Sequence, residues 1–457
     1  MAESTRRSRA QRVPRRPRLE NLGQLRSYSI QSLFGTANYS FELDPKEPTL
    51  LTGVNGTGKS TILRSIDAVS TGNWSLLLEI PFSSLKLGFE SGREISIARG
   101  KETIRIGFTG EETWNLDYSA DIDREWEHLR EIERDMLLHE QLMSERDRRD
   151  AIERVMAQRA HLDHIQSLRA RMHHGRISGP DWAAHLPEIF PVLFITDQRL
   201  IIDSPRRSDR ERTADKVSTR TAADEASRHI AREISIAKAN YANRSQALDR
   251  DFPQRVIKAI AHPPRVSDEQ LRGRLDALTH QREALEFVGL VPTEPATEFE
   301  GLDLAPTNVR SVINIYTDDT KRKLEVLEPL RLKLQLFSDF LNQHYGQKRI
   351  TIDPEYGFTV SVSSQKTSTL PPSKLSSGEQ QIMVLAHQIL FRAKPGTLVL
   401  IDEPELSLHV LWQASFVEDL AQMGKVNSLS FLLATHSPTL IGGREDLKRS
   451  LDVINGA

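Results

Sequence analysis

The chain has 457 residues, of which 38% are hydrophobic, 6% aromatic and 27% charged, which is typical of a soluble protein rich in surface helix. No run approaches the roughly 18 consecutive apolar residues of a membrane span, and no apolar signal core follows Met1. We therefore expect a cytoplasmic protein with no membrane partner. The absence of cysteine excludes disulfides and thiolate metal sites. The 61 basic and 63 acidic residues nearly cancel, which removes a global electrostatic argument for nucleic-acid binding.

Residues 1–22 form a basic tail with seven arginines against two glutamates. Such a block predicts a disordered, solvated segment, and an arm that binds phosphate groups is the alternative. Residues 23–120 then predict strands, a glycine-rich loop and a helix. The segment 25–43 alternates as strands do, and "TLLTG" from Thr49 is a short apolar run that leads into the loop. The alternating segments that follow the helix predict an antiparallel β-meander.

The sequence of residues 121–345 predicts a helical, partly coiled-coil insertion. As far as residue 176 the sequence is densely charged, and its apolar residues recur at every third or fourth position. We favour an antiparallel hairpin here over a single long helix. A head strand is expected near residues 191–200. His161, His164, His173 and His174 are expected on a solvated helix face rather than at a metal, and further helical patterns cover residues 222–261, 268–287 and 308–345.

Residues 346–457 return to strands and then alternate with helices. "RITIDPEYGFTVSVS" predicts strands, and the segment around Ser376 predicts a loop that runs into a helix. "GTLVLIDEP" and "SLSFLLATHSP" predict two buried strands. Buried strands alternating with helices indicate an α/β fold.

The stretch from Gly53 to Ser60 fits the complete phosphate-loop pattern G-x-x-x-x-G-K-[ST]. Its glycines let backbone N–H groups turn toward phosphate oxygens, and the next helix offers its positive end. Lys59 is expected to reach the β- and γ-phosphates, and the Ser60 hydroxyl to ligate Mg²⁺. We therefore predict ATP and Mg²⁺ as ligands, with nucleotide-binding residues Gly53, Asn55, Gly56, Thr57, Gly58, Lys59, Ser60 and Thr61.

The second chemical motif is "LVLIDE", four apolar residues followed by two carboxylates. A buried parallel strand would deliver Asp402 to the metal and place Glu403 where it can activate a water for attack on the γ-phosphate. Many strands end in acidic residues, so the motif gains its weight from the glycine-rich loop earlier in the chain.

Three more motifs follow in an order that makes the chain resemble an ABC-type ATPase of the SMC and OLD-like branch. "LSSGEQQ" resembles the ABC signature, "ELSLH" the D-loop and "ATHSP" the switch histidine. The resemblance implies an α/β P-loop ATPase head of ABC/SMC type, with an antiparallel β subdomain and a helical insertion. It assigns Ser376, Ser377 and Gly378 to the γ-phosphate held by an opposite subunit, Lys59, Glu403 and His436 to catalysis, and Gln198 to the Q-loop. It leaves Phe34 and Tyr39 as equal candidates for adenine stacking.

In this family the signature is too far from its own phosphate loop to touch the same nucleotide. The resemblance therefore implies that two copies face head to tail around two ATP molecules, as a dimer or part of a higher oligomer.

An insertion of intermediate length resembles that of the ATPase subunits of the PARIS, Septu and retron-associated anti-phage systems. The sequence shows no carboxylate cluster or HNH-like set that would supply a nuclease. We expect a sensor or scaffold that holds or activates a separate nuclease or toxin, with DNA or a phage component as a further partner. The alternative is an SMC- or RecF-like DNA-repair or chromosome-maintenance ATPase that clamps DNA directly.

Overall fold

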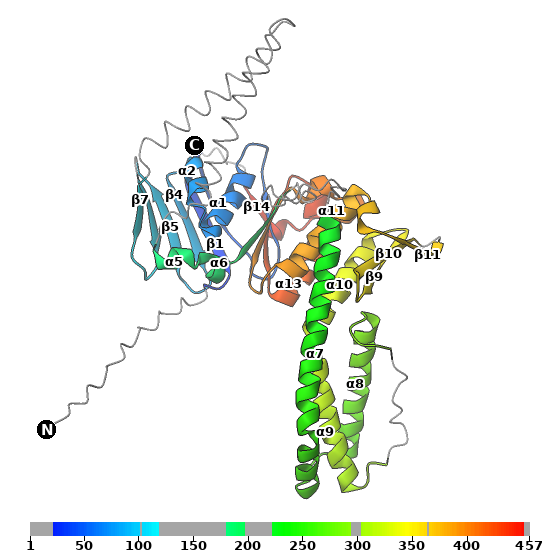
Figure 1. Ribbon diagram of the computed structural model, residues 1–457. Coiled ribbons are helices and arrows are strands. Elements are labelled where there is room, and N and C mark those ends of the chain that lie inside the picture. Colours follow the sequence, from blue (N-terminus) through cyan, green and yellow to red (C-terminus); the bar gives the residue numbers. More distant parts are fainter. Residues whose placement is uncertain are drawn as a thin grey trace, which may run out of the picture. The chain divides into compact units, whose positions relative to one another are not determined.

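The computed structural model describes residues 22–100, 103–117, 180–196, 222–293, 303–362 and 365–451 (Figure 1). The basic tail as far as residue 21, the charged segment at 121–176 with its four histidines, and Gln198 lie outside these residues. The described chain divides into two compact units, one from 22–42 and 65–192, the other from 43–64 and 193–451. None of the helices described in either unit is long and apolar enough to span a membrane.

The first unit contains a six-stranded antiparallel sheet in the order β2-β1-β4-β5-β6-β7. Its strands alternate buried with more exposed side chains, as an antiparallel sheet with one covered face does. The predicted β-meander is confirmed. The alternating run predicted at 25–43 is two strands, because Phe34 and Gly35 turn the chain with positive φ. The strands are β1 (Leu25–Leu33), β2 (Ala37–Glu42), β4 (Ser84–Phe89), β5 (Glu94–Arg99), β6 (Thr103–Phe108) and β7 (Trp114–Asp117).

Short helices of the same unit are attached to its sheet by aromatic pairs. Phe190 packs edge-on against Phe89 with ring centroids 4.9 Å apart, and Trp182 lies 5.4 Å from Phe108. The helices are α2 (Trp74–Glu79), α5 (Asp181–Ala184) and α6 (Leu186–Ile189).

The second unit contains a five-stranded sheet in the order β14-β3-β13-β12-β8. Strands β12, β13, β3 and β14 pair in parallel, and every residue of β3 and β13 is buried, as expected for a parallel sheet covered on both faces. The strands predicted around the two chemical motifs are thus confirmed, and the one near 191–200 is shorter than expected. Their bounds are β3 (Thr49–Thr52), β8 (Val192–Ile195), β12 (Leu398–Asp402), β13 (Ser430–Ala434) and β14 (Lys448–Ser450).

Three long helices, α7 (Ala222–Ala261), α8 (Asp268–Phe287) and α9 (Thr307–Leu324), lie side by side as an arm (Figure 1). The first two match the helical patterns at 222–261 and 268–287. The third pattern, 308–345, is divided between α9 and α10 (Glu328–His344). Pro329 explains the division, because it has no N–H to donate and its ring clashes with the carbonyl one turn earlier.

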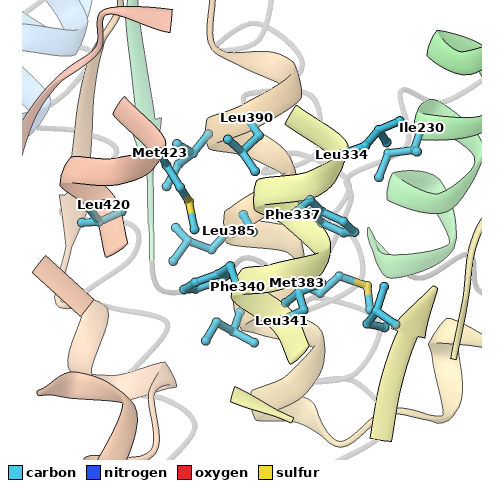
Figure 2. Packing of buried hydrophobic residues seen from close by; sticks show 14 of the residues in the cluster. Ile230, Leu334, Phe337, Phe340, Leu341, Met383, Leu385, Leu390, Leu420 and Met423 are labelled. Atoms are coloured by element: carbon cyan, nitrogen blue, oxygen red, sulfur yellow. The ribbon is translucent and has the colours of Figure 1, made fainter. Parts of the chain in front are cut away.

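Helix α10 leads from the arm into the core of the second unit. Its buried Leu334, Phe337 and Leu341 recur at helical spacing and pack between α11 and the base of α7 (Figure 2). The antiparallel strands β9 (Lys348–Asp353), β10 (Gly357–Val362) and β11 (Gln365–Leu370) adjoin this core. The remaining elements are α11 (Ser377–His387), α12 (Val410–Gln413), α13 (Phe416–Asn427), α14 (Pro438–Ile441), the 3₁₀ turns η1 (Pro372–Lys374), η3 (Pro404–Ser407) and η4 (Glu445–Leu447), and the π-helical turn η2 (Gln388–Arg392).

Candidate functional site

A glycine-rich loop joins the carboxyl end of β3 to the start of α1 (Lys59–Thr71). Gly56 and Gly58 adopt φ values of +87° and +95°, in the left-handed region that glycine tolerates best. A Cβ atom placed on Gly56 would meet nothing within 4 Å, and Asn55 beside it is exposed. The first N–H groups of α1 and the positive end of its dipole point to this loop. The loop therefore fits a chain of phosphates.

The side chain of Lys59 is held at this loop. Lys59 is only 4% exposed, and its Nζ donates to the carbonyl oxygens of Gly53 at 2.9 Å and Val54 at 3.3 Å. A buried ammonium group needs such acceptors to offset its lost hydration. The Nζ atom of Lys59 also lies 3.5 Å from Nδ1 of His436, which follows β13. The phosphate loop and the loop after β13 therefore contact the same ammonium group.

The carboxyl ends of β12 and β13 bring the predicted acidic residues to the same edge of the sheet. Asp402 is aligned with Ala434, which is aligned with Leu51 of β3. Glu403 follows in the left-handed region, with φ of +44°, and its N–H donates to the carbonyl of Ala434 at 2.9 Å. A non-glycine residue in this region stores about 1–3 kcal/mol of strain, which is common where side-chain placement serves a site.

His436 stands between Lys59 and Glu403. Its Nδ1 faces the ammonium of Lys59, while its Nε2 lies 3.9 Å from Oε1 of Glu403. An ammonium can only donate, so Nδ1 accepts and the hydrogen of a neutral ring lies on Nε2, toward Glu403. The ring is thus placed to move if phosphate groups draw Lys59 away from it, and also if the carboxylate of Glu403 changes position or charge.

Ser60 and Asp402 supply the oxygen atoms that a magnesium ion would need. The Ser60 hydroxyl donates to Oδ1 of Asp402 at 3.0 Å. A hydroxyl and a carboxylate are hard ligands, and Mg²⁺ is commonly held by one or two such protein ligands together with phosphate oxygens and water. No cluster of three or more His, Asp or Glu side chains suited to a metal occurs among the described residues. This pair therefore fits Mg²⁺ held jointly with a triphosphate.

The predicted signature residues begin helix α11. The hydroxyl of Ser376 accepts the N–H of Glu379 at 3.4 Å, and the carboxylate of Glu379 accepts the N–H and the hydroxyl of Ser376, both at 2.8 Å. This reciprocal capping box fixes the helix start. Lys348 of β9 donates to the same carboxylate at 2.6 Å. Ser376 and Ser377 are exposed, so they are accessible to a partner, and Gly378 is half-buried.

The structure therefore brings Lys59, Ser60, Asp402, Glu403 and His436 together. The other predicted residues, Gly53, Asn55, Gly56, Thr57, Gly58 and Thr61, line the loop or the first turn of α1.

The two candidates for adenine stacking belong to the first unit and differ in exposure. Tyr39 is buried, whereas Phe34 is 50% exposed. Only Phe34 therefore offers a ring face to a ligand.

One residue that was not predicted for the site contacts it directly. Glu405, in η3, accepts the backbone N–H of His436 at 2.6 Å. It begins the D-loop-like motif "ELSLH", but nothing in the sequence indicates which residue it contacts.

A family model described as "AAA domain, putative AbiEii toxin, Type IV TA system" matches residues 49–442. The solved structures that are similar include the Smc head domain of Pyrococcus furiosus, with an extended coiled coil bound to the C-terminal domain of ScpA. That match has 12% identity, covers 92% of this chain and 91% of that one, and has a TM-score of 0.36. The SMC head domain of Thermotoga maritima is 11% identical over 92% and 91% of the two chains, with a TM-score of 0.34. No curated protein matches the sequence.

Proposed function

The chain belongs to the family of AAA domains described as putative AbiEii toxins of type IV toxin–antitoxin systems, and on this basis we propose that it binds and hydrolyses ATP with Mg²⁺. The observation that carries the proposal is the meeting of the phosphate loop, Asp402, Glu403 and His436 at one edge of a parallel sheet. Ligands of open α/β sheets bind at that edge.

Each residue of the site then has a task in hydrolysis. Lys59 exchanges its loop carbonyls for the β- and γ-phosphates. Ser60 and Asp402 would hold a magnesium ion, which would neutralise phosphate charge. Glu403 accepts a proton from the attacking water, and His436 orients the γ-phosphate.

We propose that the site is completed by a second copy of the chain. Ser376, Ser377 and Gly378 of one copy would contact the γ-phosphate bound by the other, in a head-to-tail dimer or a larger assembly. Exposed apolar side chains on the phosphate loop, η3 and α12 support a surface that another protein covers: Val54 is 67% exposed, Leu406 67% and Val410 62%. ATP would then hold the two copies together until hydrolysis releases them.

In its cellular role, the chain is proposed to be the cytoplasmic ATPase subunit of a bacterial defence system that holds or activates a separate nuclease or toxin. The family description supports a toxin–antitoxin setting with more than one component. The ATPase head would consist of residues 23–120 and 346–457, and the insertion at 121–345 would hold the effector. The arm of α7, α8 and α9 supplies an extended surface for such a partner.

Affinity purification from the native host tests this role. Glu403→Gln is expected to trap the ATP-bound form and to recover a small nuclease-like or toxin-like protein. Lys59→Ala, in which we expect ATP binding to be severely weakened, serves as the matched control for a partner that depends on nucleotide. Recovery of chromosomal DNA or repair proteins alone, with a steep dependence on salt, would instead indicate an ATPase that clamps DNA.

A further inference from the structure

Glu405 uses only one of its two carboxylate oxygens. Oε1 accepts the N–H of His436 at 2.6 Å, whereas Oε2 is buried and has no hydrogen-bond partner among the residues that the structure describes. A charged acceptor at this distance forms a strong hydrogen bond, but a buried carboxylate oxygen without a donor is costly. This cost calls for a functional explanation, because buried polar atoms are otherwise almost always paired.

Gln413 joins the same two segments a second time. Its Nε2 donates to the backbone carbonyl of Glu405 at 3.4 Å and to that of Leu408 at 3.2 Å. Its Oε1 accepts the hydroxyl of Ser437, the residue after His436, at 2.7 Å. Glu405 and Gln413 therefore tie the segment after β12, which begins with Glu403, to the loop after β13.

We propose that Glu405 is a positioning residue for hydrolysis, which acts by holding the backbone of His436. With that N–H fixed, the ring keeps Nδ1 at 3.5 Å from Lys59 and Nε2 at 3.9 Å from Glu403. Without the Glu405 carboxylate the histidine loop keeps only the tie through Gln413 and Ser437, and the N–H of His436 itself is no longer held. A displacement of about 1 Å in a reacting site can cost about a hundredfold in rate. The inference rests on the proposed ATPase function and assigns a role that the motif alone does not.

Three substitutions at Glu405 distinguish the effect of side-chain length from the effect of charge. Glu405→Ala removes the acceptor, Glu405→Asp keeps the charge but is one methylene too short, and Glu405→Gln keeps an acceptor oxygen at full length. For Ala and Asp we expect kcat to fall about tenfold to a hundredfold while the affinity for MgATP and the unfolding temperature stay near wild type. Gln should recover most of the lost rate. Unchanged kcat in Glu405→Ala, equal loss in Gln and Ala, or a loss of affinity instead of rate would overturn the inference.

A second measurement keeps the inference separate from the proposed function. Nuclear magnetic resonance can follow the His436 ring, identified by the signal that disappears in His436→Gln. Glu405→Ala and Glu405→Asp should shift this signal, and Glu405→Gln should leave it close to wild type. If wild type and Lys59→Ala turned over ATP equally, the proposed function would fail. An unmoved His436 signal in Glu405→Ala would overturn the positioning role, whatever the rate of hydrolysis.

Discussion

The hydroxyl of Ser60 donates to Oδ1 of Asp402 across 3.0 Å, although 342 residues separate the two in the chain. Ser60 lies in the first turn of the helix after β3, and Asp402 ends β12. One hydrogen bond thus joins the two halves of the candidate magnesium site. We expect both residues to be needed for binding of the ion, and we expect the sheet to fold without either side chain.

Ser60→Ala and Asp402→Asn should raise the Mg²⁺ concentration needed for ATP binding by about tenfold or more, because each removes a hard oxygen ligand. Titration of Mg²⁺ at fixed ATP measures this. Glu355→Gln, at an exposed carboxylate in the same unit, is the control and should leave the titration unchanged. A magnesium requirement that is the same in all four proteins would exclude this pair as ligands.

Lys59→Ala should lower ATP affinity by about a hundredfold, because it removes charge-assisted hydrogen bonds to phosphate in a buried position. Lys59→Met is the companion variant, since it fills the same space without burying a charge. Equilibrium binding and thermal unfolding should show a folded protein that has lost ATP. Binding as tight as wild type in both variants would show that the nucleotide lies elsewhere.

The start of α11 depends on the charge pair of Lys348 and Glu379. Burial raises the pKa of Glu379, but hydrogen bonds from Lys348 and Ser376 outweigh it and hold the pKa below its usual value. Lys348→Met should therefore destabilise the protein by about 1–3 kcal/mol at pH 7, because it leaves a mostly buried carboxylate without its cation.

A double-mutant cycle checks this coupling by urea unfolding. Lys348→Met should cost far less in a Glu379→Gln background than alone. The exposed pair Lys86 and Glu94, 3.6 Å apart, is a matched control, and its coupling should stay below about 1 kcal/mol. Equal costs for Lys348→Met in the two backgrounds would refute the coupling.

Because His387 is buried, we expect the protein to lose stability at acidic pH. It is buried near the end of α11, and its Nε2 lies 3.0 Å from Nδ1 of His229 on α7. Burial, together with the charges of His229 and Arg392, lowers the pKa of His387 to about 3. Burial has the largest effect on the pKa of His229 and lowers it. The charges of Arg392 and Arg232 lower this pKa further, whereas those of Glu233 and Glu225 raise it.

The unfolded chain protonates His387 near its usual pKa of 6.5, whereas the folded chain does not until about pH 3. The unfolded state thus binds more protons across this window, so stability falls as the pH drops through it. His387→Phe should flatten the dependence of unfolding free energy on pH between 6.5 and 4. His280→Gln, at an exposed ring, should not change it. An unaltered slope in His387→Phe would assign the acid sensitivity to other groups.

The parts of the fold that the sequence predicted are those governed by local pattern. The apolar runs before Gly53 and Asp402 predicted buried strands, and regular spacing predicted α7 and α8. Pro329 interrupts the third helical pattern, a correction that follows from backbone geometry, which overrides the apolar spacing. The alternating segment at 25–43 forms strands as predicted, and the turn at Phe34 separates them.

The contacts around the site could not be predicted in the same way. The motif around Lys59 and His436 predicted which residues would gather, because parallel strands end at one edge of the sheet. It could not predict that Glu405 accepts the N–H of His436, or that Lys348 meets Glu379. Those partners depend on how separate segments pack, and many other pairings suit the same residue types.

The role of Glu403 in activating water is the central claim about this site. Phosphate release should be measured at saturating ATP and Mg²⁺ for wild type and Glu403→Gln, together with the affinity of each for MgATP. We expect near-equal affinity, a loss of about a hundredfold or more in turnover, and a longer-lived ATP-bound dimer in the variant. Equal turnover in the two proteins would contradict Glu403 as the base that activates water.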